Sequence, residues 1–168
     1  MKEFKVANHK GWFIENLGIY KGHLYAVTFS ATNAFRCGYV LLNEEDDCSL
    51  DEYDDIVQVH GGVTLMNDDA SHLFQNSDLM SNHRLIGWDY GHLYDGYDTD
   101  TVKQYLAEHP DDVDVSISVR SQMTYWLEDG YDAASEAQVI EDCISAIDDI
   151  IYHQETGEYR RENDDEEE

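Results

Sequence analysis

Two histidines and two aspartates are the side chains best suited to chemistry in this sequence. His60 directly precedes a glycine pair at 61–62, and Asp89, His92 and Asp95 follow at spacings of three residues. Where a loop leaves a strand, an Asp-x-x-His-x-x-Asp run can converge on one point. Imidazoles together with carboxylates suit Zn²⁺ or another divalent transition metal, and the same groups can act as general acid and base.

The same four side chains also have a purely structural interpretation. His60 and Asp89 can hydrogen-bond the backbone where two strands end, because buried polar groups need partners. The sequence contains no established metal-binding spacing such as His-Glu-x-x-His or paired Cys-x-x-Cys. Both interpretations stay open, and the spacing alone favours the structural one.

Acidic residues are the second candidate for function. The 168-residue chain has 37 Asp and Glu against 10 Lys and Arg, a formal net charge of −27, whereas solubility needs a magnitude of only about 2–8. The carboxylates of a dense segment, 44–55, and of one helix face can together approximate the spacing of phosphates along DNA. The residues expected to face a partner are Glu44, Glu45, Asp46, Asp47, Asp51, Glu52, Asp54, Asp55, Glu141, Asp142, Asp148 and Asp149.

Charge and hydropathy exclude several classes of function. A surface this acidic repels phosphate, so we expect no direct binding to nucleic acid or to an anionic membrane. The longest apolar runs are too short to span a bilayer, and no apolar stretch follows the N-terminus as in a secretory signal. The three widely spaced cysteines suit reduced thiols rather than a disulfide framework. We therefore expect a cytoplasmic protein.

Short apolar runs bounded by glycine or acidic residues predict a sheet that positions these groups. Residues 113–119 alternate between apolar and polar, which is typical of a half-buried strand. The segment 44–55 is too densely charged to be buried and predicts a solvated loop. The glycine pair suggests a bulge or a close approach of two backbones. The predicted strands are 23–29, 37–42, 56–60 continuing as 63–65, 85–88 and 113–119.

Two helices are predicted in the second half of the chain. An apolar pattern at residues 102–106 predicts a short helix that stops at Pro110. A longer helix begins after a Ser135 cap and carries an apolar stripe from Val139 to Ile151.

These elements predict an α+β fold, a mainly antiparallel twisted sheet packed against one long C-terminal amphipathic helix. Residues 1–153 are expected to form a single domain. Residues 154–168 have no apolar periodicity and end in a run of acids, which predicts a disordered acidic tail.

The order of the motifs resembles that of small, uncharacterised phage and prophage proteins. These share a pattern GYV … VHGG(I/V/L)T … IG(F/W)D-x-x-H-x-x-D, which this chain matches at residues 38–40, 59–64 and 86–95. The resemblance also includes the C-terminal helix, and it implies a phage origin rather than a mechanism. Relatives often carry Cys where this chain has Tyr90, so a possible thiolate ligand is absent here.

Two hypotheses of function follow. The first is a phage-encoded, non-catalytic inhibitor in the host cytoplasm. It would present carboxylates to the basic groove of a nucleic-acid-binding defence enzyme, such as a CRISPR effector or a restriction enzyme, and would need no cofactor. The second is a metal- or small-ligand-binding protein, hydrolytic in one version, that uses His60, Asp89, His92 and Asp95 with a divalent metal as cofactor. The excess of acids favours the first hypothesis.

Overall fold

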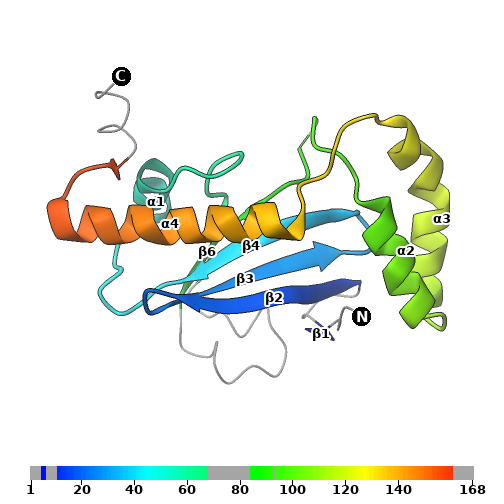
Figure 1. Ribbon diagram of the computed structural model, residues 1–168, viewed down its shortest axis with the longest axis horizontal. Helices are drawn as coiled ribbons and strands as arrows, with labels where there is room; N and C mark the ends of the chain where they lie inside the picture. Colours follow the sequence, from blue (N-terminus) through cyan, green and yellow to red (C-terminus); the bar gives the residue numbers. More distant parts are fainter. Residues whose placement is uncertain (1–4, 7–10, 68–83, 93, 161–168) are drawn as a thin grey trace.

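The computed structural model describes residues 5–6, 11–67, 84–92 and 94–160, and in these residues six strands form one antiparallel sheet (Figure 1). The strands lie in the order β1-β2-β3-β4-β6-β5. Their bounds are β1 Lys5–Val6, β2 Trp12–Tyr20, β3 His23–Ser30, β4 Phe35–Leu41, β5 Leu65–Asn67 and β6 Leu85–Asp89. The strands predicted at 23–29, 37–42 and 85–88 are therefore confirmed as β3, β4 and β6.

Helices lie on one face and at one end of this sheet. Their bounds are α1 Leu50–Ile56, α2 Thr99–Glu108, α3 Val113–Glu128 and α4 Glu136–Thr156. The long C-terminal helix α4 crosses one face with α1 beside it, and α2 and α3 stand together at one end (Figure 1). The predicted α+β fold with a long C-terminal helix is confirmed, as is the short helix before Pro110.

Apolar side chains bury α4 against the sheet. Val139, Cys143 and Ile147 of α4 are 0% exposed and share one core cluster with Val40 and Trp88 of the sheet. The predicted apolar stripe therefore faces the core, where its burial is the main stabilising term. A second cluster joins α2 and α3 to the sheet through Phe13, Phe29, Val102, Val115, Val119 and Trp126.

The ends of α4 follow from local chemistry. The hydroxyl of Ser135 accepts a hydrogen bond from a backbone amide of the first turn at 3.1 Å, as the predicted cap requires. The helix ends at Gly157, whose φ of 72° is left-handed. The segment 154–168, predicted to be a disordered tail, is therefore helical as far as Thr156, and residues 161–168 lie outside the described residues.

The predicted loop at 44–55 is wrong in its second half, because residues 50–56 form α1. Ser49 and Glu52 form a reciprocal capping box at its start. Acidic side chains in a first turn interact favourably with the helix dipole, so a dense acidic run is compatible with a helix start. Tyr53 and Ile56, 1% and 3% exposed, bury the inner side of the helix.

The strand predicted from 56–60 through 63–65 does not form. Residues 57–64 are loop and turn, and only β5 at 65–67 pairs with the sheet. Gly61 and Gly62 have φ of 72° and 80°, a left-handed conformation in which a strand cannot continue. The glycine pair thus reverses the chain instead of kinking a strand.

The strand predicted at 113–119 is also wrong, because α3 has apolar side chains on two opposite sides. Neighbouring residues of a helix are about 100° apart. Val115 and Val119 turn inward and are 0% and 3% exposed, while Val113 and Ile117 point outward and are each 60% exposed. Alternate residues therefore belong to different sides of the helix, and the resulting alternation imitates a strand.

A buried arginine ties the sheet to the helices. Arg36 of β4 is 3% exposed, and its Nε lies 2.6 Å from a carboxylate oxygen of Glu15 on β2. Another nitrogen lies 2.7 Å from the carboxylate of Asp98, the N-cap of α2. The guanidinium also donates to the backbone oxygen of Ala134, just before α4, at 2.9 Å. One side chain thus fixes where α2 and α4 begin relative to the sheet.

Replacing Arg36 with Met is expected to lower the free energy of unfolding by about 3–5 kcal/mol, because the buried Glu15 carboxylate then loses its ion pair with Arg36. Urea unfolding measures the loss. The control is Arg120→Met, since Arg120 is exposed on α3 and surface substitutions usually stay within about 0.5 kcal/mol. Equal losses in the two variants would contradict this role of Arg36.

Stability is also expected to depend on the charge of Asp98. Burial alone would raise its pKa, but hydrogen bonds from Thr101 and the Arg36 guanidinium outweigh burial and hold the pKa below the ordinary 3.8. Asp98→Asn keeps the capping oxygen and removes the charge. Well above pH 3.8 the wild type should exceed this variant by about 1–3 kcal/mol. The difference should disappear as the pH falls through the lowered pKa; a difference independent of pH would contradict the charge effect.

Candidate functional site

Two segments far apart in the sequence bring the histidines together. His60 lies in the turn after α1, and His92 lies in the loop after β6. The ring of His60 stacks on that of Tyr90, with centroids 5.2 Å apart and an interplanar angle of 4°. The buried Tyr90 hydroxyl donates to Asp142 of α4 at 2.5 Å and accepts from the indole nitrogen of Trp88 at 3.0 Å. Tyr90 is therefore fixed, and it sets the plane of His60.

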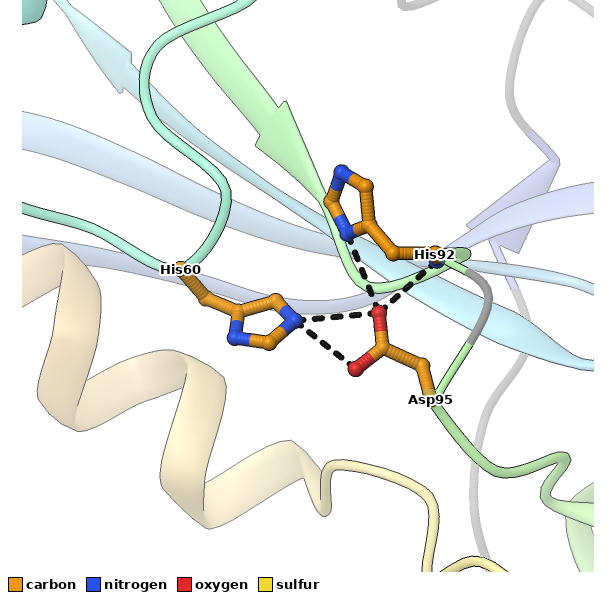
Figure 2. Close-up of side chains that lie close together, drawn as sticks. All are labelled: His60, His92 and Asp95. Atoms are coloured by element: carbon orange, nitrogen blue, oxygen red, sulfur yellow. Dashed lines mark hydrogen bonds and ion pairs between the residues drawn. The ribbon is translucent and has the colours of Figure 1, made fainter.

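The carboxylate of Asp95 lies between the two imidazoles (Figure 2). Nε2 of His60 is 2.7 Å from Oδ1 and 3.0 Å from Oδ2 of this carboxylate, and Nδ1 of His92 is 3.0 Å from Oδ2. The backbone amide of His92 also donates to Oδ2 at 2.8 Å. The loop from His92 to Asp95 is thus closed on itself, with both imidazoles held against one carboxylate.

Glycine at position 61 is required by the approach of His92. A Cβ built on Gly61 would lie 2.4 Å from Cε1 of the His92 ring, closer than atoms in contact allow. The φ of 72° at Gly61 disfavours any other residue as well. The close approach predicted from the glycine pair is confirmed, although it occurs in a turn.

Asp89 lies outside this group, although its spacing predicts it as a fourth member. Its Oδ1 accepts a hydrogen bond from the amide of Gly91 at 3.0 Å and is 3.8 Å from Nε2 of His92. Nε2 is the His92 nitrogen that does not pair with Asp95, so Asp89 lies near the other edge of the His92 ring. The structure therefore brings together three of the four predicted side chains and leaves Asp89 where outer-shell carboxylates of metal sites lie.

The geometry of the three side chains fits a metal ion. His60, His92 and Asp95 each offer one ligand atom, and these atoms lie within 4.8 Å of one another. Zinc bonds of about 2.0–2.1 Å in a tetrahedron place ligand atoms about 3.3 Å apart, close to the 3.0 Å from each histidine nitrogen to Oδ2 of Asp95. The histidine side chains are 44% and 42% exposed, so an ion can enter from solvent.

The charge of Asp95 also suits a role as a metal ligand. Burial alone would raise its pKa, but the backbone amide of His92 and the ring of His60 outweigh burial and lower the pKa below its ordinary value. The carboxylate is therefore ionised at neutral pH, as a metal ligand must be.

The acids predicted to face a partner do not all lie on the surface. The predicted exposure of Asp46 and Asp149 is wrong: they are 2% and 0% exposed. Asp149 is buried because it accepts hydrogen bonds from Arg160 at 2.7 Å and from the amide of Gln58 at 3.2 Å. Asp46 accepts one from the amide of Asn43 at 2.7 Å. Asp142 and Asp148 are half-buried, and the exposed acids of the set are Glu44, Glu45, Asp47, Asp51, Glu52, Asp54, Asp55 and Glu141.

Three exposed apolar side chains on the outer side of α3 were not predicted. Val113, Ile117 and Leu127 are 60%, 60% and 62% exposed and lie opposite the buried Val115 and Trp126. Exposed Arg120 and Thr124 lie on this side between Ile117 and Leu127, so the apolar residues do not form a continuous stripe. The alternation at 113–119 arises because Val113 and Ile117 belong to this outer side, whereas Val115 and Val119 face the core.

Comparison with protein-family models, with curated proteins and with solved structures found no match to this chain. Among the described residues no helix is both long and apolar enough to cross a membrane. The site must therefore be interpreted from its own geometry.

Proposed function

We propose that the protein binds one divalent transition-metal ion, with zinc the best fit, through His60, His92 and Asp95. The observation that carries the proposal is the convergence of three ligand atoms within 4.8 Å from two separate segments. Two imidazoles and one carboxylate suit zinc better than the all-oxygen sites of magnesium or calcium.

The number of ligands indicates what such an ion would do. Three protein ligands leave a fourth position free, as in catalytic zinc sites rather than structural ones. An ion in such a site lowers the pKa of bound water and polarises carbonyl groups, which supports hydrolysis. The net charge of −27 disfavours anionic substrates, so the chemistry best supported is metal-assisted hydrolysis of a neutral or cationic substrate.

Metal binding is tested on tag-free protein by elemental analysis and by calorimetric titration with ZnCl₂. We expect one equivalent of zinc. Loss of an outer-shell partner weakens metal binding by about 10- to 100-fold. Loss of a direct ligand, as in His60→Ala or His92→Ala, should weaken zinc binding by more than this.

The matched control is His109→Ala, because His109 packs on Tyr105 of α2 and belongs to a different element. This variant should keep full zinc binding. Retention of stoichiometric zinc by His92→Ala, or wild-type protein without a zinc equivalent, would contradict the proposal.

A second candidate function is the phage-encoded inhibitor, acting in the host cytoplasm on the basic groove of a CRISPR effector or restriction enzyme. Eight of its twelve predicted contact acids are exposed. The specific observation in its favour is the exposed apolar pair Val113 and Ile117 at the start of α3, with Asp114 and Glu128 exposed on the same helix. Surface charge mainly sets the rate and specificity of association, and an exposed apolar patch supplies the contact area that charge alone lacks.

The inhibitor hypothesis is tested by DNA cleavage with a panel of purified CRISPR effectors and restriction enzymes at low and high salt. Inhibition should weaken as salt rises. Ile117→Asp should weaken inhibition about tenfold, since it removes apolar burial. Ile19→Asp, at an apolar position 71% exposed on β2, is the control. If charge alone acted, the added carboxylate of Ile117→Asp would strengthen inhibition, and this outcome would contradict a role for α3.

A further inference from the structure

Two exposed tyrosines lie beside the candidate metal site. Tyr94 directly precedes the ligand Asp95 and is 70% exposed, and Tyr131, in the connection between α3 and α4, is 50% exposed. Their rings meet edge to face, with centroids 5.7 Å apart and an interplanar angle of 71°. The amide of Asp95 donates to the carbonyl oxygen of His92 at 2.9 Å, so Tyr94 lies within a closed turn. Two segments distant in the sequence thus place an open aromatic pair next to the metal ligands.

Backbone contacts hold this tyrosine pair against the loop of the metal site. The amide of buried Gly96, the residue after Asp95, donates to the carbonyl oxygen of Asp132 at 3.3 Å. A Cβ built on Gly96 would collide with the carbonyl oxygen of Tyr131, so the two backbones are in direct contact. The segment that carries Tyr131 is therefore packed on the loop that carries Tyr94, and the two rings stand on a fixed base.

The charge around the two rings is negative. Residues 89–97 and 128–135 contain five acids and no lysine or arginine. Arg36, which donates to the backbone of Ala134 in the second segment, is itself buried and paired with Glu15. An aromatic ring attracts a cation over its face, and rings near a right angle can contact one cation from two sides. The aromatic pair and the charge around it therefore favour the same kind of ligand, an organic cation.

We propose that Tyr94 and Tyr131 bind an alkylated ammonium group of the substrate while its hydrolysable carbonyl group lies at the metal site. This inference rests on the proposed metal-assisted hydrolysis and narrows its substrates to cationic esters and amides. Quaternary ammonium groups are the ligands that aromatic cages recognise best. Hydrolysis of such a substrate consumes one water molecule: the acyl carbon gains the hydroxyl group, and the leaving alcohol or amine takes the proton.

Binding of the cationic group alone is measured by NMR titration of tag-free protein with EDTA present and at constant ionic strength. The probe is choline, and the comparison is 3,3-dimethylbutanol, its neutral isostere. Choline should bind about fivefold more tightly, because only the cation interacts with the faces of the rings. No metal takes part in this arm, so choline preference in a protein that takes up no zinc would contradict the metal site alone.

The connection to the metal site is measured on zinc-loaded protein with two hydroxamates, which bind zinc through the hydroxamate group. One is 4-(trimethylammonio)butanohydroxamate, and the other is 5,5-dimethylhexanohydroxamate, its neutral isostere. The cationic hydroxamate should bind about fivefold more tightly than the neutral one, as choline does in the first arm.

Variants separate the two rings from the net charge of the protein. Tyr94→Leu and Tyr131→Leu should abolish the preference for the cationic probe, whereas Tyr94→Phe, which keeps the ring, should retain it. Tyr125→Leu is the matched control, because Tyr125 is 61% exposed and its ring meets that of Tyr97 instead, at 5.9 Å between centroids. Tyr94→Leu should unfold at the wild-type temperature and keep full zinc binding, because the replaced side chain is exposed and is not a ligand.

Three outcomes overturn the proposal. Equal binding of the cationic and neutral probes by the wild type means that the rings offer only an apolar surface. An unchanged preference in Tyr94→Leu means that the net charge alone attracts the cation. Equal losses in Tyr94→Leu and Tyr125→Leu mean that any exposed tyrosine of this region acts in the same way.

Discussion

The ion pair between buried Arg36 and Glu15 is the interaction on which the arrangement of helices and sheet depends. The same guanidinium holds the N-cap of α2 and the backbone just before α4. The position of α4 in turn places Asp142, which fixes the Tyr90 hydroxyl, and His60 stacks on Tyr90. A continuous series of contacts therefore connects a charge buried in the sheet to the orientation of a histidine at the surface.

Only ten basic residues are available to a chain with 37 acids, and several of those described connect elements of the fold. Lys21 in the β2–β3 turn pairs with Asp148 of α4 at 2.9 Å, and Arg160 pairs with buried Asp149 at 2.7 Å. Buried Asp46 accepts a hydrogen bond from the amide of Asn43 and lies 3.6 Å from a ring nitrogen of His23. Removing ionised groups from water is costly unless they are paired. Basic and donor groups are therefore placed where the fold buries its acids.

Elements with one simple apolar period were predicted correctly from the sequence. Elements in which two apolar patterns overlap were not. The strands at 23–29 and 37–42 and the α4 stripe have one buried side each, so their period was clear. α3 is apolar on two sides, and its alternation imitated a strand. Asp89 and Asp95 are equally spaced from His92 in sequence, and only the turn of the loop after β6 decides that Asp95 faces both imidazoles. Such long-range geometry has no local signature.

Helix α1 also supports the turn of the candidate metal site. Its inner side is buried through Tyr53 and Ile56. Asp54, between them, accepts a hydrogen bond from the amide of Val63 at 2.9 Å, and a Cβ on Gly62 would lie 2.6 Å from the same carboxylate. This carboxylate therefore holds the turn that carries His60. The position of the His60 imidazole therefore depends on two supports, the stacked ring of Tyr90 on one side and the burial of α1 on the other.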